Sequence, residues 1–179
     1  MLFDGITYDF DVSFFNEAYR NVRDPNIKNS NGDTLLTCAV LMQRYAIIAS
    51  ILAKGAEPDK PNQFGYTPLD IAIEMQDVKS LDLLIKNKAD INVTDAFGST
   101  YLIHATRIGL LPAVQLLVES GVDVNAIDNE GFTALTIAYR YGREVIVKYL
   151  LDNGAKTWVE QPFATQKSNM IQELENRWQ

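Results

Sequence analysis

The sequence predicts an all-α repeat protein in which several turn–helix–turn–helix units stack on one another. Three observations predict this fold class: glycines that recur every 33 residues, threonines two residues after one glycine column, and apolar residues at helical spacing within each period. Nine of the ten glycines fall on three such columns. Hydrophobic residues form 47% of the 179 residues, which is enough for a continuous core once the units stack.

A threonine marks the start of each first helix, because its hydroxyl can accept a hydrogen bond from a free amide of the first turn. In the second repeat Thr67 is followed by Pro68, the residue favoured at the first helical position. We expect this helix over about 67–75. An alanine column on the first helices lets the second helices approach closely. The two columns are Thr34, Thr67, Thr100 and Thr133, and Ala39, Ala72, Ala105 and Ala138.

The second helix of the same repeat is expected over about 78–87, where apolar residues recur at helical spacing. A glycine column ends these helices, since glycine readily adopts the left-handed conformation found after a helix C-terminus. It consists of Gly55, Gly121 and Gly154. Lys88 stands in the remaining repeat, so Asn87 or Lys88 must adopt a positive φ at some cost in free energy.

Two stretches of the sequence resemble the ankyrin repeat family. Residues 65–72 resemble its signature G-x-T-P-L-x-x-A, and residues 121–125 resemble its closing G-A-D-V-N. The resemblance implies an ankyrin-repeat solenoid with a row of hairpin-like fingers, and members mostly bind other proteins through the finger tips and the concave face. Leu35, Tyr101 and Ala134 depart from the signature proline, and Ile103-His104 departs from its polar-then-apolar order.

The period divides the chain into four full repeats with a capping helix at each end. The terminal caps are expected because the end repeats must present a polar outer face. The expected segments are an N-terminal segment and capping helix at 1–28, repeats at 29–61, 62–94, 95–127 and 128–158, and a C-terminal capping helix at 159–179.

Catalytic and metal-binding residues are not expected. Cys38 and His104 share a column with Ile71 and Ile137 that should point into the core. Cys38 is therefore interpreted as a small buried hydrophobe, with a nucleophile that lacks a nearby base as the alternative. His104 is interpreted as a core histidine bonded to a backbone carbonyl or a loop group, with a pH-sensitive or binding residue as the alternative.

The remaining polar residues also give no sign of an active site. Asp95 and Asp128 recur with the period, so they are interpreted as turn-forming residues. One cysteine and one histidine cannot make a zinc site without carboxylates, and no glycine-rich phosphate loop is present. We expect no enzyme activity, no cofactor, no metal and no small-molecule substrate, and an enzyme or metal protein is kept as the less favoured class.

The net charge of −7 disfavours nucleic acids and anionic membranes as partners, because both are bound mainly through Lys and Arg. No stretch is long and apolar enough for a membrane span, and the N-terminus lacks the features of a signal peptide. A single cysteine excludes an internal disulfide and fits a reducing compartment, so a cytoplasmic protein is expected.

A folded protein partner is the predicted ligand. Positions that the repeat does not fix, at the finger tips and on the open face of the first helices, are rich in aromatic residues and Arg, which are enriched at binding hot spots. The alternative is that these rings only stiffen the fingers. The predicted binding residues are Phe64, Tyr66, Glu74, Met75, Phe97, Arg107, Ile108, Glu130, Phe132, Arg140 and Tyr141, centred on Phe97, Arg107 and Tyr141.

Two versions of this function are compatible with the sequence. The first is an adaptor or inhibitor that covers the working surface of its partner. The second is a bacterial immunity or antitoxin-like protein, since an acidic chain suits the neutralisation of a basic toxin by accelerating association.

Overall fold

The computed structural model describes residues 15, 19–20, 24–30 and 32–157. Within them it contains eight α-helices, and isolated bridges are the only β structure. The chain divides into an N-terminal unit, residues 1–91, and a C-terminal unit, residues 92–179. The first unit contains α2 (Leu35–Leu41), α3 (Tyr45–Ala53), α4 (Pro68–Glu74) and α5 (Val78–Lys86), and the second contains α6 (Tyr101–Ile108), α7 (Leu111–Glu119), α8 (Ala134–Arg140) and α9 (Glu144–Asp152).

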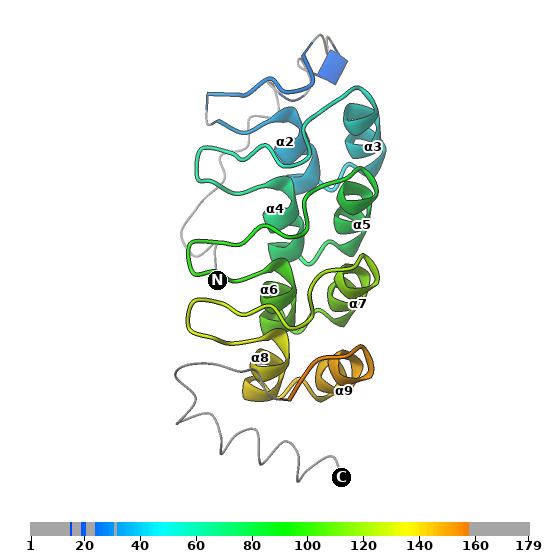
Figure 1. Cartoon of the computed structure of the whole chain (residues 1–179). Helices are drawn as coiled ribbons and strands as arrows, with labels where there is room; N and C mark the ends of the chain where they lie inside the picture. The colour runs from blue at the N-terminus through cyan, green and yellow to red at the C-terminus, as the bar shows by residue number, and fades with distance from the viewer. Residues whose placement is uncertain (1–14, 16–18, 21–23, 31, 158–179) are drawn as a thin grey trace. The chain divides into compact units, whose positions relative to one another are not determined.

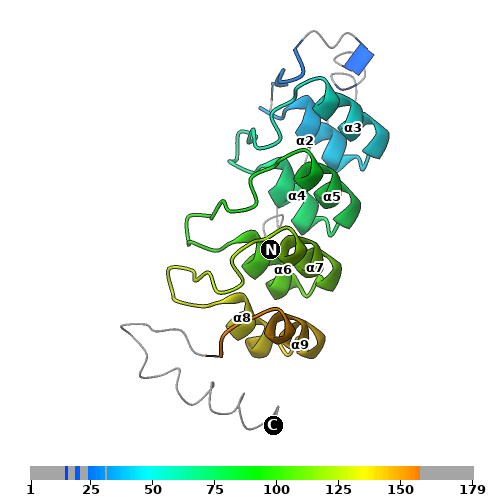
Figure 2. The same cartoon turned by 45° about the vertical axis from the view of Figure 1, so that its right-hand side comes forward.

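Each unit is built from two helix–turn–helix pairs. In the N-terminal unit α2 and α4 form one layer and α3 and α5 the other (Figures 1 and 2). In the C-terminal unit α6 and α8 form one layer and α7 and α9 the other. The column of four alanines at the helix crossings is completely buried, which confirms the close approach expected there. The predicted all-α repeat fold is therefore correct.

The four threonines begin the first helices as predicted. Each side chain accepts a hydrogen bond from the amide three residues later, for example Asp70 N to Thr67 Oγ1 at 3.1 Å. The Thr67 amide in turn donates to Asp70 Oδ2 at 2.8 Å, and the two reciprocal bonds form a capping box. In the third repeat the position of Asp70 is taken by Ile103, whose apolar side chain cannot accept this second bond.

The left-handed residues that end the helices include more than glycines. Lys88, not Asn87, adopts the positive φ after α5, at +67°. Gln43 and Gln76 also adopt positive φ, at +52° and +55°, after α2 and α4. They stand 66 and 33 residues before Gly109, so they continue a glycine column that the sequence shows only in its second half.

The fingers are short hairpins between helix pairs. Antiparallel bridges join Lys28 to Thr34, Thr94 to Thr100, and Ile127 to Thr133. In the remaining finger Pro61 occupies the place of the first partner, and proline has no amide hydrogen to donate.

Several predictions fall outside this description. The C-terminal capping helix at 159–179 lies outside the described residues, as does most of the N-terminal cap at 1–28. The predicted repeat boundaries stay predictions. Among the described residues, no helix combines the length and apolar character that a membrane crossing needs.

Candidate protein-interaction surface

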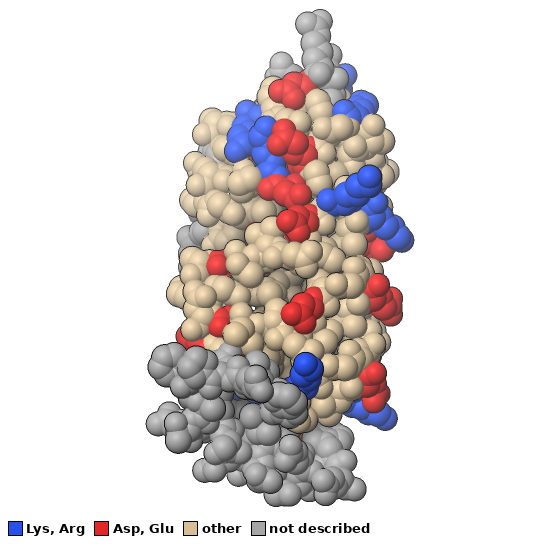
Figure 3. All heavy atoms as spheres, in the orientation of Figure 1, with Lys and Arg blue, Asp and Glu red and all other residues tan. Residues whose placement is uncertain are grey.

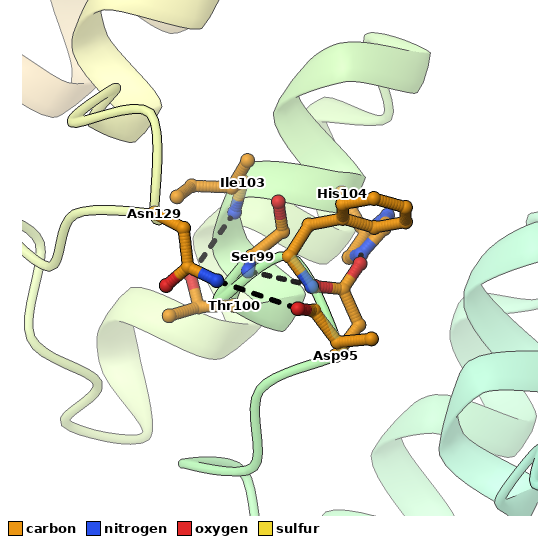
Figure 4. Close-up of polar contacts among 8 residues, drawn as sticks. Asp95, Ser99, Thr100, Ile103, His104 and Asn129 are labelled. Carbon is orange, nitrogen blue, oxygen red and sulfur yellow. Dashed lines mark hydrogen bonds and ion pairs between the residues drawn. The ribbon is translucent and has the colours of Figure 1, made fainter.

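The finger around Phe97, in the C-terminal unit, is organised by Asp95 (Figure 4). Asp95 Oδ1 accepts hydrogen bonds from the amides of Phe97 and Ser99, both at 2.8 Å. Its other oxygen, Oδ2, accepts from His104 Nε2 at 3.0 Å, because a carboxylate oxygen is an acceptor. The predicted turn-forming role of Asp95 is confirmed, and His104 holds the carboxylate from the helix below.

Asn129 fixes the tip of the same finger from the neighbouring finger. Its amide donates to the Phe97 carbonyl at 2.9 Å, and its side-chain Nδ2 donates to the Ala96 carbonyl at 3.3 Å. The fingers lie so close that a Cβ atom on Gly98 would stand 2.5 Å from Asn129 Oδ1. The amide and the carbonyl of Phe97 are thus both hydrogen-bonded, whereas the residue as a whole is 72% exposed.

His104 does not have the expected core position, but it does make the expected kind of hydrogen bond. Cys38, Ile71 and Ile137 of its column are buried, but the His104 side chain keeps 17% of its surface exposed. The core placement is wrong because the ring is engaged by the finger carboxylate instead of by the helix pair. The expected hydrogen bond to a loop group is present. Cys38 is buried and in no disulfide, as expected.

The fourth finger is organised in the same way. Asp128 is buried, and its Oδ1 accepts from the amides of Glu130 at 3.0 Å and Phe132 at 2.7 Å. The Arg140 guanidinium lies 5.3 Å from the centre of the Phe132 ring, within cation–π range. This contact joins the end of α8 to the finger, so the two form one surface. Phe132 is partly buried and fits the finger-stiffening alternative better than Phe97 does.

The end of α6 is closed by Arg143, a residue that the sequence did not single out. Its Nη2 donates to the carbonyls of Arg107 at 3.3 Å and Ile108 at 3.1 Å. The positive charge also suits a helix C-terminus. Arg107 and Ile108 are partly exposed beside it, and Tyr141 after α8 is 50% exposed. Arg143 and Asn129 lie at positions that vary between repeats, so periodicity gave no sign of their role.

In the N-terminal unit the predicted residues form a separate set. Asn62 Oδ1 accepts from the amides of Phe64 at 2.9 Å and Tyr66 at 3.1 Å. The Phe64 ring is 50% exposed, whereas Tyr66 is partly buried. Glu74 and Met75 lie at the end of α4, where Met75 is 36% exposed. On the face shown in Figure 3, the finger side has few charged side chains, and most of those visible lie over the second helices and the loops.

Perturbed ionisable groups lie away from the predicted binding residues. Burial raises the pKa of Asp59, and the nearby charge of Asp90 raises it further. A hydrogen bond from the Asp90 amide acts in the opposite direction. Burial and the nearby Asp77 carboxylate raise the pKa of Tyr45, and burial and Glu119 raise that of Tyr149. The described part of the chain holds no group of three or more His, Cys, Asp or Glu suited to a metal ion.

The helix pairs start at a threonine N-cap and end in a left-handed residue, and bridged fingers lie between them. These features define a finger-bearing helical repeat protein. A family model described as "Ankyrin repeats (3 copies)" matches residues 9–95 and 79–161, so the chain belongs to the ankyrin repeat family. Ankyrin repeats are generic protein-interaction modules and typically have no enzymatic activity. No curated protein matches the chain.

Proposed function

We propose that this protein binds a folded partner through its finger tips and the ends of its first helices. The observation that carries the proposal is Phe97, which is 72% exposed while both of its backbone groups are held by hydrogen bonds. A large apolar side chain on a rigid support loses little conformational entropy on binding, which favours affinity. By covering a surface of its partner, the protein inhibits it or holds it in a complex.

The test is a pull-down from the native cell with mass spectrometry and a Phe97→Ala/Arg107→Ala/Tyr141→Ala variant. We expect the partner recovered by the wild type to fall at least about tenfold, because hot-spot truncations commonly cost 2 kcal/mol or more. A Val145→Ala/Lys148→Ala variant on α9 removes exposed side chains away from the fingers and should retain the partner. Equal recovery by both variants, with both folded by circular dichroism, refutes the proposal.

The net charge of −7 supports a more specific version, in which the partner is a basic protein such as a toxin that this chain neutralises. Unlike charges accelerate encounter, whereas nucleic acids and anionic membranes are repelled. The chain's single cysteine, Cys38, forms no disulfide, which supports a cytoplasmic site of action. A neighbouring toxin gene whose product is lethal alone, and harmless when this protein is co-expressed, is the expected result. A kinase as the co-purified partner would contradict this version.

A further inference from the structure

Two arginines stand one repeat apart on the first helices of the C-terminal unit, although the whole chain has a net charge of −7. We group them with aromatic residues of the same fingers and helix ends, and call Phe97, Arg107, Phe132, Arg140 and Tyr141 the arginine face. Arg107 and Arg140 occupy the same point of successive repeats, 33 residues apart, at the ends of α6 and α8, and these helices pack on each other. Among the described residues the ion pairs are Lys60–Glu57, Lys86–Asp82 and His104–Asp95, so neither arginine has a carboxylate partner there.

Contacts other than ion pairs position the Arg140 side chain and the Arg107 backbone. Arg140 Cζ lies over the Phe132 ring, 5.3 Å from its centre, and this cation–π contact does not use the N–H donors of the guanidinium. The backbone carbonyl of Arg107 accepts from Arg143, which fixes the chain from which the Arg107 side chain projects. Arg143 adds a third positive charge at the end of α6.

The scaffold does not require arginine at these points. The same positions in the N-terminal unit are Leu41 and Glu74, and both are the last residues of first helices. A residue needed for packing would recur with the alanine and threonine columns. The two arginines are therefore available for a role outside the fold.

We infer that the arginine face docks an acidic segment of the partner, with Asp or Glu carboxylates on Arg107 and Arg140 and an apolar side chain against Phe97 and Tyr141. The inference rests on the proposed function and specifies the partner's contact chemistry. Guanidinium groups bind carboxylates through two parallel hydrogen bonds, and aromatic neighbours exclude water from them. The net charge of −7 acts on the approach of the whole partner, whereas contacts within a Debye length of about 10 Å are set by the local charges.

The test is selection of a random 12-residue peptide display library against the full-length chain, followed by affinity measurements with the selected peptides. We expect them to be enriched in Asp and Glu together with apolar residues. Their affinity should fall at least about tenfold in Arg107→Gln/Arg140→Gln and several-fold between 0.05 M and 0.5 M salt. Gln removes the charge and has a helix propensity close to that of Arg, so the fold is preserved.

The matched control is Lys148→Gln/Lys156→Gln, which removes the same charge from exposed positions outside the arginine face and should leave affinity unchanged. Peptides that are neutral or basic, failure to select any peptide, or equal loss in both charge variants would overturn the inference. Preferential binding of a 12-nucleotide single-stranded DNA to this face would also overturn it. Phe97→Ala separates the two proposals: neutral peptides that depend on Phe97 sink only this inference, whereas peptides indifferent to Phe97 contradict the proposed function too.

Discussion

The two units bend their backbones into the left-handed region at corresponding points but fill those points differently. Among the described residues, every such residue of the C-terminal unit is glycine, whereas three of those in the N-terminal unit carry side chains. The glycines are Gly98, Gly109, Gly121, Gly131, Gly142 and Gly154 in the C-terminal unit and Gly32, Gly55 and Gly65 in the N-terminal unit, where Gln43, Gln76 and Lys88 take the other places.

This difference shows that the repeat geometry, not the local residue, imposes the backbone conformation. A residue with a Cβ atom in the left-handed region costs about 1 kcal/mol relative to its relaxed conformation. Stability in repeat proteins is close to a sum of local and nearest-neighbour terms. The N-terminal unit therefore carries strain that the C-terminal unit avoids, and substitutions at these points test the comparison directly.

The largest effect is expected where a side chain is forced into the C-terminal unit. Gly109→Ala should lower the free energy of unfolding by about 2 kcal/mol, from the left-handed conformation at φ +86° and from loss of the Arg143 bonds to the α6 carbonyls. Its Cβ would stand 2.7 Å from Arg143 Cζ. Urea denaturation followed by circular dichroism measures it.

Gly142→Ala is the matched variant, because nothing lies within 4 Å of its Cβ. It should cost about 1 kcal/mol, for the backbone conformation alone. Equal costs for the two variants would show that Arg143 contributes nothing to the end of α6.

Relief of strain in the N-terminal unit is the converse experiment. Gln43→Gly/Gln76→Gly/Lys88→Gly should raise the free energy of unfolding by about 1.5 kcal/mol, because the relieved strain exceeds the extra entropy of glycine in the unfolded chain. Glycine at Ser50, inside α3, is the control and should destabilise by about 0.5 kcal/mol. If the triple variant is less stable than the wild type, the three side chains contribute more than their backbones cost.

In the core of α6 it is the C-terminal unit that carries the less favourable residue. Thr106 is fully buried and its Oγ1 has no hydrogen-bond partner, whereas Val40 and Ile73 hold this position in the N-terminal unit. Thr106→Val should raise the free energy of unfolding by about 1 kcal/mol, since an unsatisfied buried hydroxyl is replaced by a methyl group of similar size. Thr106→Ser keeps the hydroxyl and should be destabilising. A destabilising Thr106→Val variant would mean that the hydroxyl is satisfied in solution.

The smallest effect concerns the ties between successive loops. Asp59 Oδ1 accepts from the Asp90 amide at 2.9 Å, a role that asparagine fills at Asn26 and Asn125. Because burial raises the pKa of Asp59, the folded state binds its proton more tightly than the unfolded state does. Its contribution to stability is therefore present at low pH and lost as pH rises through the carboxyl range.

Asp59→Asn retains the acceptor without the charge, so it should stabilise at pH 7 by less than about 0.5 kcal/mol, as expected of a screened, partly exposed group. The advantage over the wild type should shrink as pH falls toward 3. Asn125→Asp in the C-terminal unit is the reciprocal variant and should acquire the same pH dependence. An Asp59→Asn advantage independent of pH would exclude a charge origin.

The sequence predicts the helices well because their ends are encoded locally. Thr67 and Pro68 placed α4, and the spacing of apolar residues placed α5, within one residue of their observed ends. Gln43 and Gln76 were missed because their left-handed conformations follow from the packing of the helix pair, which no residue preference announces. The departure Ile103-His104 was visible, but its explanation needs the approach of Asp95, nine residues earlier, in three dimensions.

The sequence predicted the residue types of the candidate interaction surface, but not the hydrogen bonds that hold its finger in place. The sequence identified Phe97, and the structure leaves it the most exposed large hydrophobic residue among those described. The residues that hold the finger, His104 and Asn129, act through hydrogen bonds between non-consecutive segments, one from His104 and two from Asn129. Periodicity reports packing that recurs in every repeat, so it gives no sign of the bond made by His104, the single histidine of the chain.

The bond between Asn129 and the Phe97 carbonyl also limits how the length of this chain can change during evolution. A residue inserted near either finger tip would move one partner of that bond away from the other. At Gly98 the two fingers already lie so close that they could not shift toward each other to restore it. Duplication or loss of a whole 33-residue period would keep such partners in register. Natural variants of this protein should thus differ in length by multiples of a period, with shorter gaps confined to the chain ends.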